Sequence, residues 1–378
     1  MMPCIRERTG LTRGSAMASA KRAIARIAYG SRFDRVPWGQ RIYVRPGERY
    51  AREIQWSLLL RRSPIVSLDA YRSRVPLGEI EEFITCHMCG ESRQQPLFTP
   101  TGPQQDGQES WTYRVVRCPS CGFLYRNPNV RPERLGDLYA SGYSGFLTGD
   151  YAAGRRLRYR LTMDAFGQVL ADGAKRRLLD FGCGAGLFLE LAEELGFDAY
   201  GVDLSPDSVE QANARLSAAT AYHGAPEDVP EIAAGGFDVI TLWSVLAHLP
   251  RPLDDFARLR RLLAPGGVLL VLTVNARSLL LKAHGAAWSG FTKNHLMFYS
   301  SLTMPTLLRR TGFAGVAFAP FYGDTIEAGT AELPERMRQR LRRAVAATDG
   351  GNMLRALAFA DDEAIARWGT GLPVRALT

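Results

Sequence analysis

Histidine and cysteine are scarce in this chain of 378 residues, which contains 5 of the first and 6 of the second. Six scattered cysteines do not form the disulfide framework of a small secreted domain, so we exclude that class. Long apolar runs are also missing, because the longest, at 268–272, has only the length of a β-strand. No segment therefore resembles a transmembrane helix, and we expect a cytoplasmic protein.

Excess positive charge is absent from most of the chain. Residues 1–80 hold 16 Lys and Arg against 6 Asp and Glu, of 47 and 38 in all, which leaves 31 against 32 elsewhere. Within this basic arm, residues 16–29 could form an amphipathic helix that contacts an anionic membrane surface or nucleic acid. A transit peptide, an upstream start with Met17 as initiator, and a disordered extension stay open as alternatives.

The most informative segment is LLDFGCGAGL at 178–187, in which an apolar run ends in Asp180 and three glycines follow two apart. Glycine permits a sharp turn and lets a ligand lie against the backbone. The next segment looks helical, and a helix N-terminus presents free N–H groups to such a ligand. A dinucleotide loop needs its third glycine one residue later, where Leu187 stands, so the spacing disfavours a dinucleotide.

A second acid follows at the end of the next apolar run. Asp203 closes the segment AYGVD, 17 residues beyond Gly186, where a ribose-binding acid falls in a doubly wound sheet. Alternatively, Asp203 is only a charge near the helix that Ser205 and Pro206 open. Strand-like runs at 177–181, 198–202, 237–242 and 268–274 alternate with helix-like segments. This alternation predicts a parallel sheet with a ligand at the carboxyl ends of its strands.

Residues 160–321 resemble class I S-adenosylmethionine (SAM)-dependent methyltransferases. The resemblance lies in LLDFGCGAGLFLELAEELGF, YGVDLSP, GFDVITLWSVLAHLPRP, LRRLLAPGGVLLVLTVN and HLMFYSSLTMPTLLRRTGF. It implies an α/β fold with a doubly wound, mostly parallel, seven-stranded Rossmann-like sheet, and SAM as cofactor. It also implies that the acid and glycines of the loop hold the methionine end, while Asp203 holds the ribose. The expected cofactor contacts are Asp180, Gly182, Cys183, Gly184, Gly186, Asp203, Leu204, Asp228, Trp243 and Tyr143.

Two of these expected contacts, Asp228 and Tyr143, each have an alternative. The family usually has an acid near the adenine amino group after the third strand, but this chain reads GAPEDVP at 224–230, with Ala225 in its place. We expect Asp228 or Glu227 to serve instead. Tyr143 is expected in a helical lid over the cofactor, with a role at the edge of the core as the alternative.

Two Cys-x-x-Cys-Gly turns precede the resembling segment. Cys86 and Cys89 form the first, Cys118 and Cys121 the second, and 28 residues separate them. Four thiolates on two tight turns suit a structural, tetrahedral zinc ion with no open coordination position. The sequence therefore predicts a small zinc-ribbon-like module in which His87 is an exposed loop residue.

We therefore divide the chain into four parts. Residues 1–80 are a basic N-terminal extension, 81–130 a Cys4 zinc-binding module, 131–325 the methyltransferase domain and 326–378 a helical C-terminal extension. The extension is expected to contain polar helices at 334–347 and 353–368 and a short final strand at 374–377.

Methyl transfer is an in-line displacement, so a protein supplies alignment, and a base only where the acceptor must lose a proton. His295, in the segment after the fifth strand, is the predicted catalytic base, with a hydrogen-bonded structural role as the alternative. His248 is expected to be structural.

The acceptor is the least determined element. A Cys4 module before a class I domain resembles sugar C-methyltransferases, which implies a sugar or other glycan, lipid or secondary-metabolite acceptor. An RNA base, bound through the zinc module and the basic arm, is the alternative, although the neutral remainder of the chain argues against it. A non-catalytic zinc-ribbon adaptor is a third possibility. Neither the atom methylated nor the oligomeric state follows from the sequence.

Overall fold

The computed structural model describes residues 63–102, 110–138, 149–170, 176–319 and 349–377, with isolated positions at 321, 336, 339 and 343. The basic segment 1–62 and Tyr143 lie outside the described residues. No helix in these ranges is both long and apolar enough to cross a bilayer.

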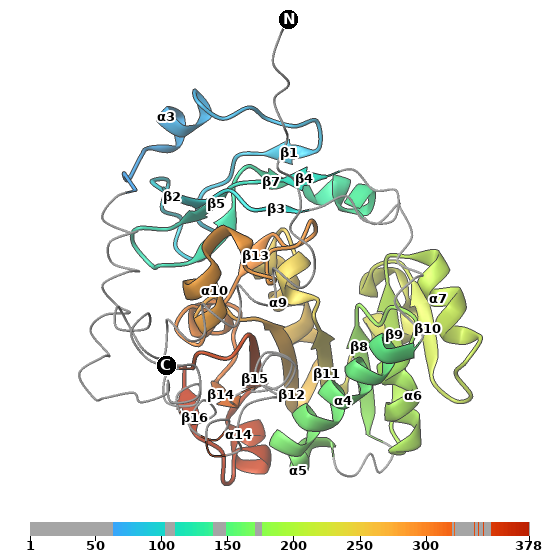
Figure 1. Ribbon diagram of the computed structural model, residues 1–378. Coiled ribbons are helices and arrows are strands. Elements are labelled where there is room, and N and C mark those ends of the chain that lie inside the picture. The colour runs from blue at the N-terminus through green and yellow to red at the C-terminus, as the bar shows by residue number, and fades with distance from the viewer. Residues whose placement is uncertain are drawn as a thin grey trace, which may run out of the picture.

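An eight-stranded sheet forms the centre of the molecule, in the order β10-β9-β8-β11-β12-β15-β14-β16 (Figure 1). The first five strands are parallel, and the last three are antiparallel to their neighbours. The strands are β8 (Arg177–Phe181), β9 (Asp198–Asp203), β10 (Thr220–His223), β11 (Phe237–Trp243), β12 (Leu263–Val274), β14 (Gly315–Ala319), β15 (Met353–Phe359) and β16 (Val374–Ala376).

Helices cover both faces of this sheet, as expected of an α/β fold whose buried strands carry apolar side chains on both sides. One face packs against α4 (Gly149–Ala165), α5 (Gly167–Leu170), α6 (Leu187–Glu194), α7 (Pro206–Asn213), α10 (Leu279–His284) and α14 (Asp362–Trp368). The other packs against α8 (Pro230–Ala233), α9 (Pro252–Leu262) and α11 (Met304–Arg310). Short 3₁₀ turns follow β10 and β11, namely η5 (Pro226–Asp228) and η6 (Leu246–His248), and η7 (Gly285–Ala287) follows α10.

The C-terminal region differs from its prediction. Residues 353–359 form β15, a fully buried strand inserted between β12 and β14, and not part of a polar helix. The expected helical extension over 326–378 is therefore wrong at β15, and the sheet extends beyond the predicted boundary at 325. The sheet also has eight strands where seven were predicted, because β16 adds an edge strand next to β14.

The cysteine-containing segment forms its own small sheets above the large one (Figure 1). Its main sheet has the order β13-β6-β5-β2, and flanking pairs join β1 to β7 and β3 to β4. The elements are α3 (Leu68–Arg72), β1 (Glu81–Glu82), β2 (Gln95–Phe98), β3 (Thr101–Gly102), β4 (Trp111–Thr112), β5 (Val115–Arg117), β6 (Leu124–Arg126), β7 (Asn129–Val130), η3 (Pro132–Leu138) and β13 (Met297–Phe298).

Strand β13 is the link between the two parts. It comes from the segment after β12, yet it pairs with β6, with Met297 opposite Tyr125 and Phe298 opposite Leu124. The module is therefore not an independent domain, because a strand of the larger domain completes its sheet.

Candidate functional site

A cavity of about 440 Å³ opens at the carboxyl ends of β8, β9 and β11. Its walls come from the loops after β8, β9, β10 and β11, from α4, from the first turns of α9 and from η3. This volume falls in the range of small-molecule sites, and its position is where open α/β sheets bind ligands.

The glycine loop after β8 forms the floor of the cavity. Gly182 has φ 74°, and a Cβ there would lie 2.5 Å from Val245 Cγ2, so only glycine fits. Gly184 also has a left-handed backbone, with φ 53°, but a Cβ there would meet no atom within 4 Å. The open side of Gly184 therefore leaves room for a ligand to lie directly against the backbone.

Asp180 lies at the end of β8, beneath this loop. It is 2% exposed, and Thr241 Oγ1 of the neighbouring strand donates a hydrogen bond of 2.7 Å to its Oδ1. Burial raises the pKa of Asp180 to about 7, and the nearby charge of Asp203 contributes to the same shift. A cationic ligand group placed beside this carboxylate would favour its ionised form.

Asp203 ties the end of β9 to the glycine loop. Its Oδ2 accepts a hydrogen bond from Gly184 N at 2.8 Å, and its Oδ1 accepts one from Ser205 N at 2.9 Å. Ser205 itself caps α7 through Ser208 N, so Asp203 is not needed as the helix cap. Burial raises the pKa of Asp203 in spite of these hydrogen bonds.

The α4 wall contributes residues that sequence reasoning missed. Arg155 lines the cavity, and its positive charge acts on Asp180, Tyr159 and His248. Tyr159 lines it too, and its ring packs 4.8 Å from that of Trp243. Nothing in the local run RRLRYR at 155–160 indicates which arginine turns inward, since that depends on how α4 packs on the sheet.

Trp243, predicted as a cofactor contact, lies at the end of β11. It lines the cavity, is 4% exposed and packs 4.7 Å from the ring of Phe188. Its buried Nε1–H meets no acceptor among the residues that the structure describes. A buried donor without a partner is costly, so a ligand atom that accepts from it would be stabilised there.

The predicted contacts separate into two groups. Those that line the cavity are Asp180, Gly182, Cys183, Gly184, Asp203, Leu204 and Trp243. Gly186 lies at the start of α6, where a Cβ would come within 3.0 Å of Ala212, so its function here is helix packing. Asp228 and His295 are not among the cavity residues.

The placement of His295 argues against its predicted role as the base. Its Nδ1 lies 2.7 Å from the carbonyl oxygen of Gly290, and its ring packs edge-on against His248 at 4.8 Å. His248 lines the cavity in its place, but its ring is held by the carbonyls of Ser244 and Asn294. Burial lowers the pKa of both imidazoles, so both are neutral at physiological pH. The described contacts fit the structural alternative.

The loop after β10 does not provide the expected adenine-side acid. Asp228 Oδ2 accepts a hydrogen bond from Ala225 N at 3.2 Å and thereby caps η5. Glu227 forms an ion pair with Arg258, with Oε1 and Nη2 3.2 Å apart. Of this loop, Gly224, Ala225 and Pro226 line the cavity.

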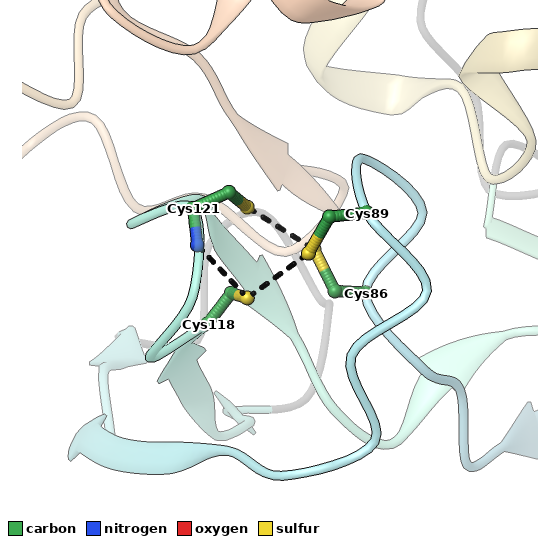
Figure 2. A group of neighbouring side chains, drawn as sticks. All are labelled: Cys86, Cys89, Cys118 and Cys121. Carbon is green, nitrogen blue, oxygen red and sulfur yellow. Dashed lines mark hydrogen bonds between the residues drawn. The ribbon is translucent and has the colours of Figure 1, made fainter.

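The four cysteines of the module converge from two loops, with their sulfur atoms pointing toward one another (Figure 2). Cys86 Sγ lies 3.5 Å from Cys121 Sγ, Cys89 Sγ lies 3.5 Å from Cys118 Sγ, and all four lie within 4.8 Å of one another. The cluster therefore offers four soft donors around one point, the arrangement that a tetrahedral metal ion requires.

The cluster also contacts the larger domain. Arg310, in the last turn of α11, donates hydrogen bonds to the carbonyl oxygens of His87 and Met88, at 2.9 and 2.8 Å. His87 is half-buried and not exposed as predicted, and burial lowers its pKa. The first cysteine turn is thus fixed to the domain that contains the cavity.

Comparison with known proteins shows what the larger domain resembles. Residues 151–317 match the family model described as a methyltransferase domain. The ubiquinone biosynthesis O-methyltransferase of Methylococcus capsulatus is 36% identical over 129 residues, which cover 32% of this chain and 54% of that protein. The enzyme of the same name from Psychrobacter cryohalolentis is 33% identical over 123 residues, which cover 29% and 48%. The chain spans about half the length of the curated relatives it matches.

Solved structures show more distant likeness. A SAM-dependent methyltransferase of Thermotoga maritima, described as a possible histamine N-methyltransferase, has a TM-score of 0.42 and 18% identity, covering 60% of this chain and 100% of that one. The geranyl diphosphate C-methyltransferase of Streptomyces coelicolor A3(2) has a TM-score of 0.39 and 16% identity, covering 59% and 89%. At these scores the likeness says nothing about the acceptor. The family match therefore shows that residues 151–317 are similar to a methyltransferase domain.

Proposed function

We propose that this chain transfers a methyl group from SAM to a small-molecule acceptor in the cavity, and that the cysteine cluster holds a structural zinc ion. The observation that supports the proposal most is the order of groups along the cavity floor. Asp180, the open face of Gly184 and then Asp203 follow one another within the matched domain. That order suits an amino acid at one end and a ribose at the other.

The methionine end would lie between β8 and α4. The carboxylate of Asp180 would pair with the ammonium group, and the guanidinium of Arg155, which lines the same cavity, would pair with the carboxylate. The unpartnered Nε1–H of Trp243 is a further donor on the same wall. Bound SAM supplies an electrophilic methyl carbon on a sulfonium, and these residues would hold and align it while the apolar rings exclude water.

The cysteine cluster fits zinc in donor type and spacing. Four sulfurs at about 2.3 Å from a tetrahedral zinc ion lie about 3.8 Å apart. The observed separations, from 3.5 Å for two pairs to 4.8 Å at most, bracket that value. Four protein ligands fill the coordination shell, so we propose a role in folding and not in catalysis.

For the acceptor we propose a hydroxyl group on a sugar, lipid or secondary metabolite. The curated relatives are O-methyltransferases by name, which favours oxygen. His248 and His295 are held by carbonyl groups, so the described part of the cavity offers no free imidazole as base. An acceptor that ionises readily, such as a phenol, fits a site whose main contribution is alignment.

An RNA base remains the second candidate acceptor, although it is less favoured. Its support is the charge of residues 1–80, most of which lie outside the described residues. The relatives named above act in the biosynthesis of a small molecule, according to their names.

Transfer of tritium from methyl-labelled SAM tests the proposal. The zinc-loaded full chain would be incubated with a panel of phenols, sugar nucleotides and total RNA, and label would be measured in each fraction. We expect label in a small-molecule fraction, with the phenols first. Label in RNA alone would overturn the small-molecule proposal, and no transfer together with no SAM binding would overturn the enzyme proposal itself.

A further inference from the structure

The loop after β10 offers no side-chain acceptor for the amino group of an adenine in the cavity. The 6-amino group of an adenine donates hydrogen bonds, and a buried donor needs an acceptor. Ala225 has no side-chain acceptor, Asp228 is occupied with the backbone of Ala225, and Glu227 faces Arg258. Of the acids in this loop, neither Asp228 nor Glu227 lines the cavity.

Helix α9 brings a different acid to the same place. Asp255 lies in its first turn, lines the cavity and has a side chain 16% exposed. Arg258, one turn later, also lines the cavity and links Asp255 to the loop after β10. Its Nη1 is 3.7 Å from Asp255 Oδ1, and its Nη2 is 3.2 Å from Glu227 Oε1. Arg258 therefore joins Asp255 to Glu227 of the loop after β10, whose residues Ala225 and Pro226 line the same cavity.

The carboxylate of Asp255 is available to a ligand. Among the residues that the structure describes, Arg258 is its ion-pair partner, and no donor lies within hydrogen-bond distance of its oxygens. A largely buried carboxylate without hydrogen bonds is unfavourable. Burial raises the pKa of Asp255 to about 6 while Arg258 lowers it, so the group is mostly ionised at neutral pH.

Asp254, the neighbouring acid, is placed differently. It also lines the cavity, but its side chain is exposed, and its charge acts on His87 of the cysteine turn. Asp254 therefore provides a matched control, because it is the same residue type on the same turn of α9 but its side chain is exposed.

We propose that Asp255 accepts the hydrogen bond of the adenine 6-amino group, in place of the acid that the loop after β10 lacks. This inference rests on the proposed use of SAM. It assigns to α9 the recognition of the base, and it makes the cavity selective for an amino group over a carbonyl at that position. A carbonyl oxygen there would face the carboxylate with two acceptors and no proton between them.

The test is a comparison of S-adenosylhomocysteine with S-inosylhomocysteine, which differs by a carbonyl in place of the amino group. Calorimetric titration of the full, zinc-loaded chain should give tighter binding of the adenosine compound by about 10- to 100-fold, the scale of a hydrogen bond to a charged group. In Asp255→Asn the ratio should fall to within about threefold, because an amide presents either an oxygen or an N–H. Asp254→Asn should keep the wild-type ratio.

A rescue variant separates recognition from damage to the fold. Ala225→Asp, introduced into Asp255→Asn, should restore the preference by returning an acid to the loop. A wild-type ratio in Asp255→Asn, or equal binding of both compounds by the wild type, would overturn the inference while leaving the use of SAM intact. Failure of the wild type to bind either compound would overturn both proposals.

Discussion

The two walls of the cavity are built in different ways. The floor and one wall come from residues 180–205, a continuous stretch in which Asp203 bonds directly to the backbone of Gly184. The other wall is assembled from η3 and α4, which precede that stretch, and from α9, which follows it after β10 and β11. This wall borders the cysteine module, because the charges of Arg251 and Asp254 act on His87. The first wall is set by one stretch of sequence, whereas the second wall, which contains Arg155 and Asp255, depends on the packing of separate helices.

The wall next to the cysteine module (the module side) also depends on the four-cysteine cluster. The wall formed by residues 180–205 (the glycine-loop side) does not. The pairing of β13 with β6, the hydrogen bond from Arg126 to the Lys293 carbonyl and the hydrogen bonds of Arg310 attach the module to the domain. None of these contacts involves residues 180–205. We therefore predict that a substitution can damage the module side of the cavity without the glycine-loop side, and the reverse.

The largest effect is expected from Cys118→Ser, which removes one of the four thiolates. We expect loss of the bound metal and unfolding of the module, because metal binding contributes on the order of 10 kcal/mol in small zinc domains. Elemental analysis and thermal unfolding measure both changes. Cys183→Ser, outside the cluster, should keep the metal; one zinc per chain in Cys118→Ser would contradict the four-thiolate site.

The next effect is expected from His295→Ala, at the boundary between the two sides. Loss of a buried ring and its hydrogen bond to Gly290 should lower the free energy of unfolding by about 2–4 kcal/mol. Affinity for SAM should stay within about threefold. Denaturant unfolding and calorimetry distinguish the roles, since a catalytic base would instead show normal stability and lost turnover.

On the local side, Asp203→Ala should weaken SAM binding by about 1–3 kcal/mol, the cost of leaving buried ribose hydroxyls and Gly184 N without their acceptor. The metal content should not change. Calorimetry measures the affinity, and Asp207→Ala, an acid on the first turn of the next helix, serves as the control. Unchanged affinity would remove Asp203 from the site.

A smaller effect is expected from pH. The folded pKa of Asp180, about 7, lies above its ordinary value of 3.8, so the ligand-free protein binds a proton there as the pH falls. This group therefore makes folding less favourable as the pH rises from about 4 to 7, whereas a cationic ligand needs the ionised form. SAM affinity should fall about tenfold between pH 7.5 and pH 6. Asp180→Asn should bind weakly at both values; a pH-independent wild type would exclude the proposed ammonium contact.

The sequence was sufficient for the local half of the site. Asp180, the glycines of the loop and Asp203 all lie within residues 180–203, and the geometry of the loop follows from the glycines themselves. The four-cysteine grouping was also predictable, since two tight turns place their own sulfurs together. The sheet strand β15 was not, because MLRALAF followed by an acid-rich run has the composition of a helix. Its position between β12 and β14 decides its conformation.

The other residues that the sequence did not place correctly also depend on tertiary packing. Arg155 and Asp255 look like ordinary charged residues of amphipathic helices, and only the packing of α4 and α9 turns them toward the cavity. His295 was assigned to the cavity from its place after the fifth strand, but a carbonyl five residues away and the ring of His248 hold it behind the wall. Such positions depend on tertiary contacts that no local pattern contains.

The most direct test of the central claim is calorimetric titration of the zinc-assayed full chain with SAM and S-adenosylhomocysteine, with NAD as the control. We predict micromolar binding of the first two and none of NAD, and a loss of that binding in Asp203→Ala at unchanged zinc content. A folded, zinc-containing protein that binds neither compound, or that binds NAD instead, would contradict the account.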